Sequence, residues 1–574
     1  MRGFVTSGTV SAMRPIPATL LTLLVGCNSP TYLAITAAQD QFDTLGSSGD
    51  LEPATTTTTG DTTANTDGTT AGASTGDPVL TGEAPETGTT GEATDTSDTT
   101  DPQSPSVGDA EKPSIISVTL PAKLPAAGPV SLEVQTEHTG KVEITLDGAD
   151  AGTLSAAGGG LFVGELTVRG AIDNGWHSVE VIARQGLNEV SQSESYEVET
   201  PAPGTMAWFK AGPSGSQTNR LARTPDGDTL EAGHVEINTV SRPSLTRRSG
   251  LTGAQLWSVT LDTREGSVAD LAVLPDGRVW VAMNVRKPGD PSAQPRIALL
   301  DAAGEATGIE VLGDIGHIVR GIAADAEGGC FAVGVASAGL DMDIAYWRVN
   351  GDGVQTLGST WDYAPEQKDK HNFSEFAMDV VVDGEIAWAV GASQGKHSPK
   401  KVVRTRGILV PLDLDTGAAA LPIIAPASGG YTEQSVFFGA ALHPNGILVT
   451  GYECDEDSQF YALETSLYDA SGERSWTHSD AIGAGYRYGN DIALDSQGRV
   501  IIAGSITENG ARRGYVAAHV VGEIATLPLF EHWFPASKPS EAFAVLVNDY
   551  DRIFAAGFTT VNGSTQARIT QLHP

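Results

Sequence analysis

The feature that most constrains this chain is a short segment that recurs seven times from residue 220 onward. Its clearest copy, Asp491 to Gly504, reads DIALDSQGRVIIAG, with alternating apolar residues before a glycine turn and a β-branched run after it. That order is typical of a β-hairpin whose two strands flank a tight turn. The other six copies lie at residues 220–233, 270–283, 321–334, 377–391, 439–451 and 544–557.

The spacing of the copies indicates how the hairpins assemble. Successive copies end 50, 51, 57, 60, 53 and 53 residues apart, at positions 233, 283, 334, 391, 451, 504 and 557. An all-β repeat of about 50 residues is typical of β-propeller blades and not of a helical solenoid. We therefore predict an all-β fold, with a seven-bladed β-propeller at residues 204–574.

The end of the chain predicts how the ring of blades closes. Each hairpin is followed by two more expected strands, and the fourth often carries a tryptophan, as at Trp257, Trp361, Trp476 and Trp533. After Gly557 only one expected strand remains, at residues 567–572. We predict that strand 206–210, which carries Trp208, completes the last blade, because this closure leaves no exposed sheet edge.

The run Asp495-x-x-Gly-Arg-Val-Ile-Ile-Ala-Gly504 resembles the repeat of bacterial seven-bladed β-propeller proteins of the SBBP type. The sixth and seventh copies are closest to that repeat. The second copy departs from it, because Met283 replaces the closing glycine, and the fifth is one residue shorter after its turn. The resemblance implies the propeller fold and a place on the bacterial surface.

A short apolar run, residues 20–27 (LLTLLVGC), ends in a cysteine. It is too short to cross a bilayer and has the form of a signal peptide. Its last four residues resemble a bacterial lipobox, which implies cleavage before Cys27 and a diacylglyceryl group on that cysteine. We expect residues 1–27 to be a signal peptide, with Met13 as an alternative start, and the mature protein to be lipid-anchored at the outer membrane or cell surface. The alternative is an ordinary secretory signal in which Cys27 has no role.

Residues 28–112 are expected to form a disordered tether. From Asn28 to Glu111 there is no lysine or arginine but fifteen acidic residues, and threonine dominates the middle. Such a segment buries too little apolar surface to offset the entropy lost on ordering. As a flexible coil of about 85 residues it would span roughly 50 Å.

Residues 113–201 are expected to form a β-sandwich, because six or seven short alternating stretches are separated by glycine turns. Residues 175–186 (GWHSVEVIARQG) resemble the penultimate strand of bacterial Ig-like domains, which usually act as spacers. His177 in this stretch is expected to lie on the strand surface and to bind no ligand.

The formal net charge of −36 argues against nucleic acid as a partner, because the surface repels phosphate backbones. Three cysteines in 574 residues are too few for a disulfide framework. We expect Cys330 and Cys454 to be structural thiols outside any disulfide. We also expect a monomer whose only membrane contact is the lipid anchor.

The predicted propeller divides its loops between two faces. The turns within hairpins are short, whereas the connections that lead into the inner strands, such as 362–374, 428–436 and 481–490, are long. Binding residues concentrate on loops held by a rigid scaffold, so this loop-rich face is the candidate site. Its candidate ligand-binding residues are His371, Tyr431, Tyr486, Arg487 and Tyr488; the alternative is that they are ordinary surface residues.

No metal-binding, nucleophile or phosphate-loop motif is present in the sequence, and we expect no cofactor. The equivalent inner-strand positions are expected at Arg220, Asp270, Gly321, Ala377, Gly439, Asp491 and Ala544. Asp270 and Asp491 are weak candidates for a cation, which needs more oxygens than two carboxylates supply. We therefore expect a recognition or scaffold module for protein or glycan ligands. The alternative is a propeller hydrolase or lyase with a metal near the axis.

Overall fold

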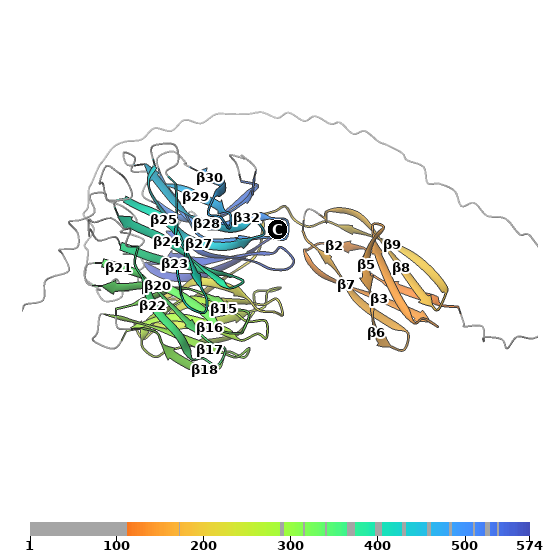
Figure 1. Cartoon of the computed structure of the whole chain (residues 1–574). Helices are drawn as coiled ribbons and strands as arrows, with labels where there is room; N and C mark the ends of the chain where they lie inside the picture. The colour runs from red at the N-terminus through yellow and green to blue at the C-terminus, as the bar shows by residue number, and fades with distance from the viewer. Residues whose placement is uncertain are drawn as a thin grey trace, which may run out of the picture. The chain divides into compact units, whose positions relative to one another are not determined.

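The computed structural model describes residues 112–574, apart from 171–172, 287–291, 314–315, 339–340, 364–373, 396–403, 427–431, 456–460, 481–484, 509–510, 523–527 and 536–538. The regular elements of this part are all β-strands, so the predicted all-β class is confirmed for it (Figure 1). The described residues include no helix with the length and apolar character needed to cross a membrane. The predicted signal peptide and tether lie outside the described residues.

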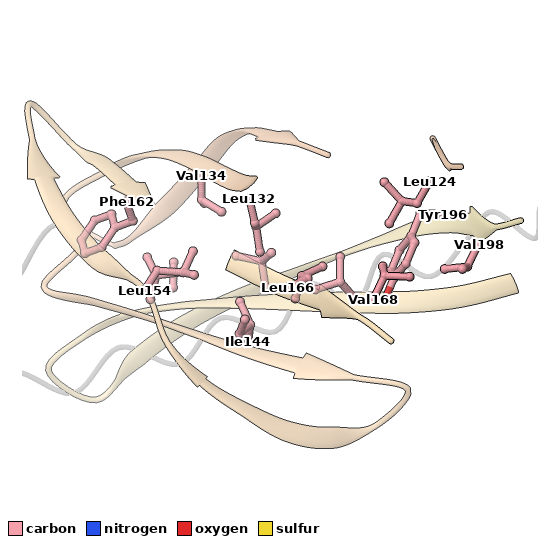
Figure 2. Close-up of a cluster of buried hydrophobic side chains, with 14 residues drawn as sticks. Leu124, Leu132, Val134, Ile144, Leu154, Phe162, Leu166, Val168, Tyr196 and Val198 are labelled. Carbon is pink, nitrogen blue, oxygen red and sulfur yellow. The ribbon is translucent and has the colours of Figure 1, made fainter. Parts of the chain in front are cut away.

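Nine strands between residues 114 and 198 form two sheets, ordered β1-β3-β7-β6 and β2-β9-β8-β4-β5. Alternate side chains of both sheets meet in one core; on β8, for example, Val179, Val181 and Ala183 are fully buried. Figure 2 shows side chains of this core, including Leu132, Ile144 and Phe162, gathered between the strands. The strands are β1 (Ser114–Thr119), β2 (Lys123–Leu124), β3 (Gly128–Glu137), β4 (Lys141–Leu146), β5 (Ala149–Thr153), β6 (Ser155–Gly158), β7 (Leu161–Val168), β8 (Gly175–Gln185) and β9 (Asn188–Val198).

The remaining strands form seven antiparallel units of four strands, here called units 1 to 7 (Figure 1). Units 1 to 3 comprise β11 (Ser216–Arg223), β12 (Thr229–Ile237), β13 (Val240–Arg248), β14 (Gln255–Thr260); β15 (Glu265–Val273), β16 (Val279–Arg286), β17 (Ala293–Leu300), β18 (Ala306–Val311); and β19 (Ile318–Ala324), β20 (Cys330–Ala338), β21 (Asp341–Val349), β22 (Gln355–Trp361). Units 4 and 5 comprise β23 (Ser374–Asp383), β24 (Ile386–Gly395), β25 (Arg404–Asp413), β26 (Ile423–Ile424); and β27 (Thr432–His443), β28 (Gly446–Asp455), β29 (Tyr461–Tyr468), β30 (Arg474–Asp480). Units 6 and 7 comprise β31 (Gly485–Leu494), β32 (Arg499–Glu508), β33 (Ala511–Val520), β34 (Phe530–Trp533); and β35 (Ser540–Val547), β36 (Ile553–Val561), β37 (Ser564–Leu572), β10 (Met206–Ser214).

The first strands of the units, here called inner strands, contact one another in order. β11 contacts β15, and the series continues through β19, β23, β27, β31 and β35, which contacts β11 again. Neighbouring units pack through apolar side chains, as where Trp280 of unit 2 and Trp347 of unit 3 share one buried cluster. One backbone pair also joins two units directly, because Tyr461 pairs in parallel with Tyr486.

The pairing predicted for strand 206–210 is present. β10 runs antiparallel to β37, with Trp208 opposite Gln571 and Lys210 opposite Ile569. Its Trp208 ring lies 6.0 Å, centroid to centroid, from Phe554 of the same unit. The last unit therefore takes its fourth strand from residues that precede the first repeat.

Every inner strand contains a register shift at one equivalent position, and β27 has a second shift between Thr432 and Gln434. The shared shift explains the glycine that closes six of the seven repeats. In unit 5 the shift lies between Phe437 and Gly439, and Phe437 pairs with Gly451. A Cβ at Gly451 would overlap the carbonyl oxygen of Val436, and the closing glycines of units 1, 3, 4, 6 and 7 meet a carbonyl in the same way. Met283 stands at this position in unit 2 and is buried.

The tryptophans of the fourth strands occupy more than one position, which corrects the simple pattern expected from sequence. Trp208, Trp257 and Trp476 share one register position, whereas Trp361 and Trp533 lie elsewhere on their strands. Trp208 and Trp257 pack on glycines in the turn of the following unit: a Cβ at Gly253 would lie 2.8 Å from Trp208. These side chains therefore connect neighbouring units.

Candidate functional site

The structure describes three of the five predicted ligand-binding residues. Tyr486, Arg487 and Tyr488 are consecutive on β31, near the end at which the predicted loop-rich face begins. His371 and Tyr431 fall within 364–373 and 427–431, outside the described residues. The side chains of Tyr486, Arg487 and Tyr488 contact different groups.

Arg487 is held between units 5 and 6. Its guanidinium donates 2.6 Å hydrogen bonds to Asp480 of unit 5 and to Glu531 of unit 6, and it lies 4.4 Å from the centre of the Tyr515 ring. Only 1% of the residue is exposed. Although burial lowers the pKa of Arg487, its interactions with Tyr515, Glu531 and Asp480 raise it overall, so the group stays charged. A buried cation paired with two carboxylates is an internal ion pair.

Tyr488 also uses its polar atom inside the protein. Its hydroxyl donates to Glu541 of unit 7 at 2.9 Å, and Arg512 donates to the other oxygen of that carboxylate at 2.8 Å. Burial and the Glu541 charge raise the pKa of Tyr488 well above its ordinary value. Tyr488 therefore joins units 6 and 7 and is not an acid or base near neutral pH.

Tyr486 is the partly exposed end of a chain of aromatic rings across units 5 and 6. Its ring lies 5.1 Å from Tyr461, which lies 4.9 Å from Tyr452. Tyr452 and Tyr488 both contact Phe438, at 5.8 and 6.3 Å. Phe438, Tyr452 and Tyr461 are buried, whereas Tyr486 and Tyr488 are partly exposed. The buried rings thus form a rigid base under Tyr486, a ring that solvent reaches.

The inner-strand positions near the propeller axis differ from the predicted set at one residue. The register shift places Asp379, opposite Val390, at the position equivalent to Asp270 and Asp491, whereas Ala377 lies before the shift. The expectation of Ala377 at this position is therefore wrong. Counting back seven residues from the turn glycine failed in unit 4, because Gly384 directly follows the end of the strand in a shorter turn than that of Gly498. Each of the three aspartates is followed by Leu, Val or Ile, a signal that would have identified Asp379.

Each of the three aspartates binds backbone N–H groups of two units. One oxygen of Asp270 accepts from Leu271, and the other accepts from Ile322 of unit 3 at 2.8 Å. Asp379 accepts from Ala440, and Asp491 accepts from Val545, in the same arrangement. The weak cation candidates Asp270 and Asp491 thus use both carboxylate oxygens to hold neighbouring units together.

Arg220 is the cation that faces these carboxylates. Its Nε lies 3.5 Å from Asp270, and it also interacts electrostatically with Asp379 and Asp491. Burial raises the pKa of Asp270 to about 8 and that of Asp491 to about 6, while Arg220 opposes both shifts. Three carboxylates around one guanidinium hold protons more tightly than exposed aspartates do.

A separate group of carboxylates lies between units 3 and 4. Asp343, Asp362 and Glu375 place one oxygen each within 4.8 Å of one another, and Ser393 donates to Glu375 at 2.9 Å. Carboxylate oxygens suit calcium, which takes six to eight oxygen ligands. Among the described residues, these three carboxylates form a group at metal-binding spacing. The sequence did not predict the group, because Asp343 and Glu375 lie on different strands and Asp362 lies in a connection between strands.

A groove of about 530 Å³ lies at the opposite end of the hairpins. The turn of unit 5 around His443 and Asn445 lines it together with Asp383 and Asp469. Burial lowers the pKa of His443, so this ring is neutral near pH 7. The groove was not predicted from sequence, because its residues belong to three separate turns.

No protein-family model matches the chain, and no curated protein matches it. Its fold is similar to that of hydrazine synthase from Kuenenia stuttgartiensis, with 13% identity, a TM-score of 0.41, and coverage of 65% of this chain and 99% of that one. The polysaccharide lyase Uly1 is 9% identical, with a TM-score of 0.40 and coverage of 62% and 90%. The β-propeller domain of the Trilobed protease from Pyrococcus furiosus is 9% identical, with a TM-score of 0.37 and coverage of 64% and 94%. Solved β-propellers are thus among the structures that this all-β chain resembles, and the likeness concerns the fold alone.

Proposed function

We propose that this protein is a cell-envelope lipoprotein whose seven-bladed propeller recognises a protein or glycan ligand through its loop-rich face. The observation that carries the proposal is Tyr486, a partly exposed ring on a base of packed aromatic side chains. Rigid aromatic side chains bind ligands at low entropic cost and are enriched where proteins recognise partners. Arg487 and Tyr488 hold the strand that presents Tyr486.

The seven-bladed propeller is supported by the seven units, whose inner strands share a register shift at one equivalent position, and by contacts that return from β35 to β11. We further propose that the nine strands before residue 201 form an Ig-like spacer, because two sheets share one core. Residues 28–112 would act as a tether between this spacer and the lipid on Cys27. Deleting residues 55–105 should leave the melting of the folded part unchanged.

The anchor has its own test. Cys27→Ser should release the protein from membranes into the soluble fraction, because acyl chains contribute about 0.8 kcal/mol for each buried CH₂ group. Mass spectrometry of the mature wild-type protein should find a diacylglyceryl group on Cys27. An unmodified Cys27 would refute the anchor without bearing on the propeller.

The recognition site is tested by comparing two aromatic variants of the full chain on arrays of glycans and purified envelope proteins. Tyr486→Ala should lose at least tenfold in affinity for any ligand that the wild type binds, a loss of about 1.4 kcal/mol. Trp176→Ala removes a ring that is 72% exposed on the sandwich and serves as the matched control. Equal binding by wild type and Tyr486→Ala would place the site elsewhere.

The second candidate function is a metal-dependent hydrolase or lyase. The axial aspartates do not favour it, since backbone N–H groups occupy their oxygens. The three carboxylates at Asp343, Asp362 and Glu375 are the observation in its favour, and they lie away from that axial set. Metal analysis of wild type and Asp362→Asn distinguishes the candidates: stoichiometric metal that the variant loses would favour the enzyme.

A further inference from the structure

Two histidines from different units meet in the boundary between units 5 and 6. The rings of His478 on β30 and His519 on β33 have centroids 4.3 Å apart and planes inclined by 42°. His478 is 9% exposed and His519 is 3% exposed. The Nε2 atom of each ring has no hydrogen-bond partner among the described residues.

Two such nitrogens are unusual, because a buried polar atom without a partner costs about 1–3 kcal/mol. Most buried polar groups of folded proteins have a partner. The pair is therefore expected to bind something that supplies a bond to both rings. A lone pair on a neutral imidazole is a common ligand for transition metals.

The surrounding charges permit a cation. Asp480 lies two residues from His478 on the same strand, and Glu531 lies on β34; both bind the single guanidinium of Arg487. These three groups sum to one negative charge, with two carboxylates against one cation.

The distance between the two ring centres is close to that expected for two imidazoles bound to one metal ion. Imidazole nitrogens bind zinc at about 2.0–2.1 Å, so two rings on one ion at a right or tetrahedral angle have centres roughly 4.5–5 Å apart. The observed 4.3 Å lies within about half an ångström of that range. A small rotation of either ring would suffice.

We propose that His478 and His519 bind one divalent transition-metal ion, such as Zn²⁺ or Cu²⁺, and that this ion links unit 5 to unit 6. Water would complete its coordination, because no carboxylate of the described residues lies at metal-binding spacing from both rings. The site is independent of the ligand-binding face around Tyr486.

The test begins with the full-length mature protein stripped of metal and titrated with ZnCl₂ by calorimetry and thermal unfolding. One ion should bind per chain and raise the melting temperature. His478→Asn and His519→Asn should each weaken binding about tenfold or more. His532→Asn is the matched control. The buried Nε2 of His532 also lacks a hydrogen-bond partner among the described residues, but no other ring in that part of the chain contacts His532. This variant should bind zinc as wild type does.

A measurement on wild type covers the case in which a variant fails to fold. Cu²⁺ added at one equivalent should give an electron paramagnetic resonance spectrum with splitting from imidazole nitrogens. Absence of that splitting would overturn the proposal, as would equal zinc affinity in wild type and a folded His478→Asn/His519→Asn variant.

Discussion

The carboxylate of Asp379 accepts the backbone N–H of Ala440 at 2.9 Å, across the boundary between units 4 and 5. The same bond joins units 2 and 3 and units 6 and 7, so aspartate alternates with a small residue around the inner strands. Space explains the alternation: a Cβ at Gly321 would lie 2.8 Å from the Cα of Asp379, and a Cβ at Gly439 would lie 2.8 Å from the Cα of Asp491. The equivalent inner-strand position thus links unit 2 to unit 3, unit 4 to unit 5, and unit 6 to unit 7.

Asp379→Asn should destabilise the folded part by about 1–3 kcal/mol, because an amide presents one acceptor where two backbone N–H groups need one each. The matched control is Asp352→Asn in an exposed turn, which should change the free energy of unfolding by less than about 0.5 kcal/mol. Urea denaturation measures both variants. Equal stability of the two would mean that the bond to Ala440 contributes little.

Asp270 should make stability depend on pH. Its pKa is raised from 3.8 to about 8, mainly by burial, with Asp379 adding to the shift and Arg220 opposing it. The folded state thus holds this proton more tightly than the unfolded chain, so the contribution of Asp270 is largest below about pH 4 and declines as the pH rises toward 8.

Asp270→Asn has no proton to lose at this position. The free energy of unfolding of the variant, relative to wild type, should therefore increase between about pH 4 and pH 8, even though the variant loses one hydrogen bond. Urea denaturation at several pH values measures this difference. A difference that stays constant across the range would contradict the assigned shift.

Gly451→Ala should be destabilising, because the new methyl group would overlap the Val436 carbonyl opposite the register shift. Unit 2 accommodates Met283 at the equivalent position with its strands still paired, so the strands of unit 5 would have to shift in the same way. We expect a loss of about 1–3 kcal/mol. Gly308→Ala is the control, since a Cβ there meets nothing within 4 Å. Thermal unfolding should show a fall for the first variant and none for the second.

Trp208→Ala should cost about 3 kcal/mol, near the low end for a large aromatic because the side chain is partly exposed. The loss weakens the closing strand where it contacts Phe554 and the turn at Gly253. Trp176→Ala removes a ring that is 72% exposed and is the control, with an expected change of less than about 0.5 kcal/mol. Thermal unfolding measures both variants, and equal effects would mean that Trp208 contributes little to the closing strand.

The sequence alone determined the elements that depend on local pattern. Alternating apolar residues and turn glycines located the inner hairpins. The last repeat has three expected strands where the others have four, and this difference predicted that β10 supplies the fourth strand. Cys330 and Cys454 are buried and outside any disulfide, as the count and spacing of cysteines predicted.

Only the tertiary structure decided which of the candidate side chains are buried and which are reached by solvent. Tyr486, Arg487 and Tyr488 are consecutive in sequence, yet Arg487 is buried against Asp480 and the Tyr488 hydroxyl is bound to Glu541 of a neighbouring unit. Tyr486 is partly exposed and packs on other rings. Asp379 was missed because the hairpin turn of unit 4 is shorter than that of unit 6, so a fixed count from the turn glycine reached Ala377. The partners of Arg487 and Tyr488 lie across a boundary between neighbouring units. No local pattern of residues encodes which strand of a neighbouring unit will pack against a given side chain.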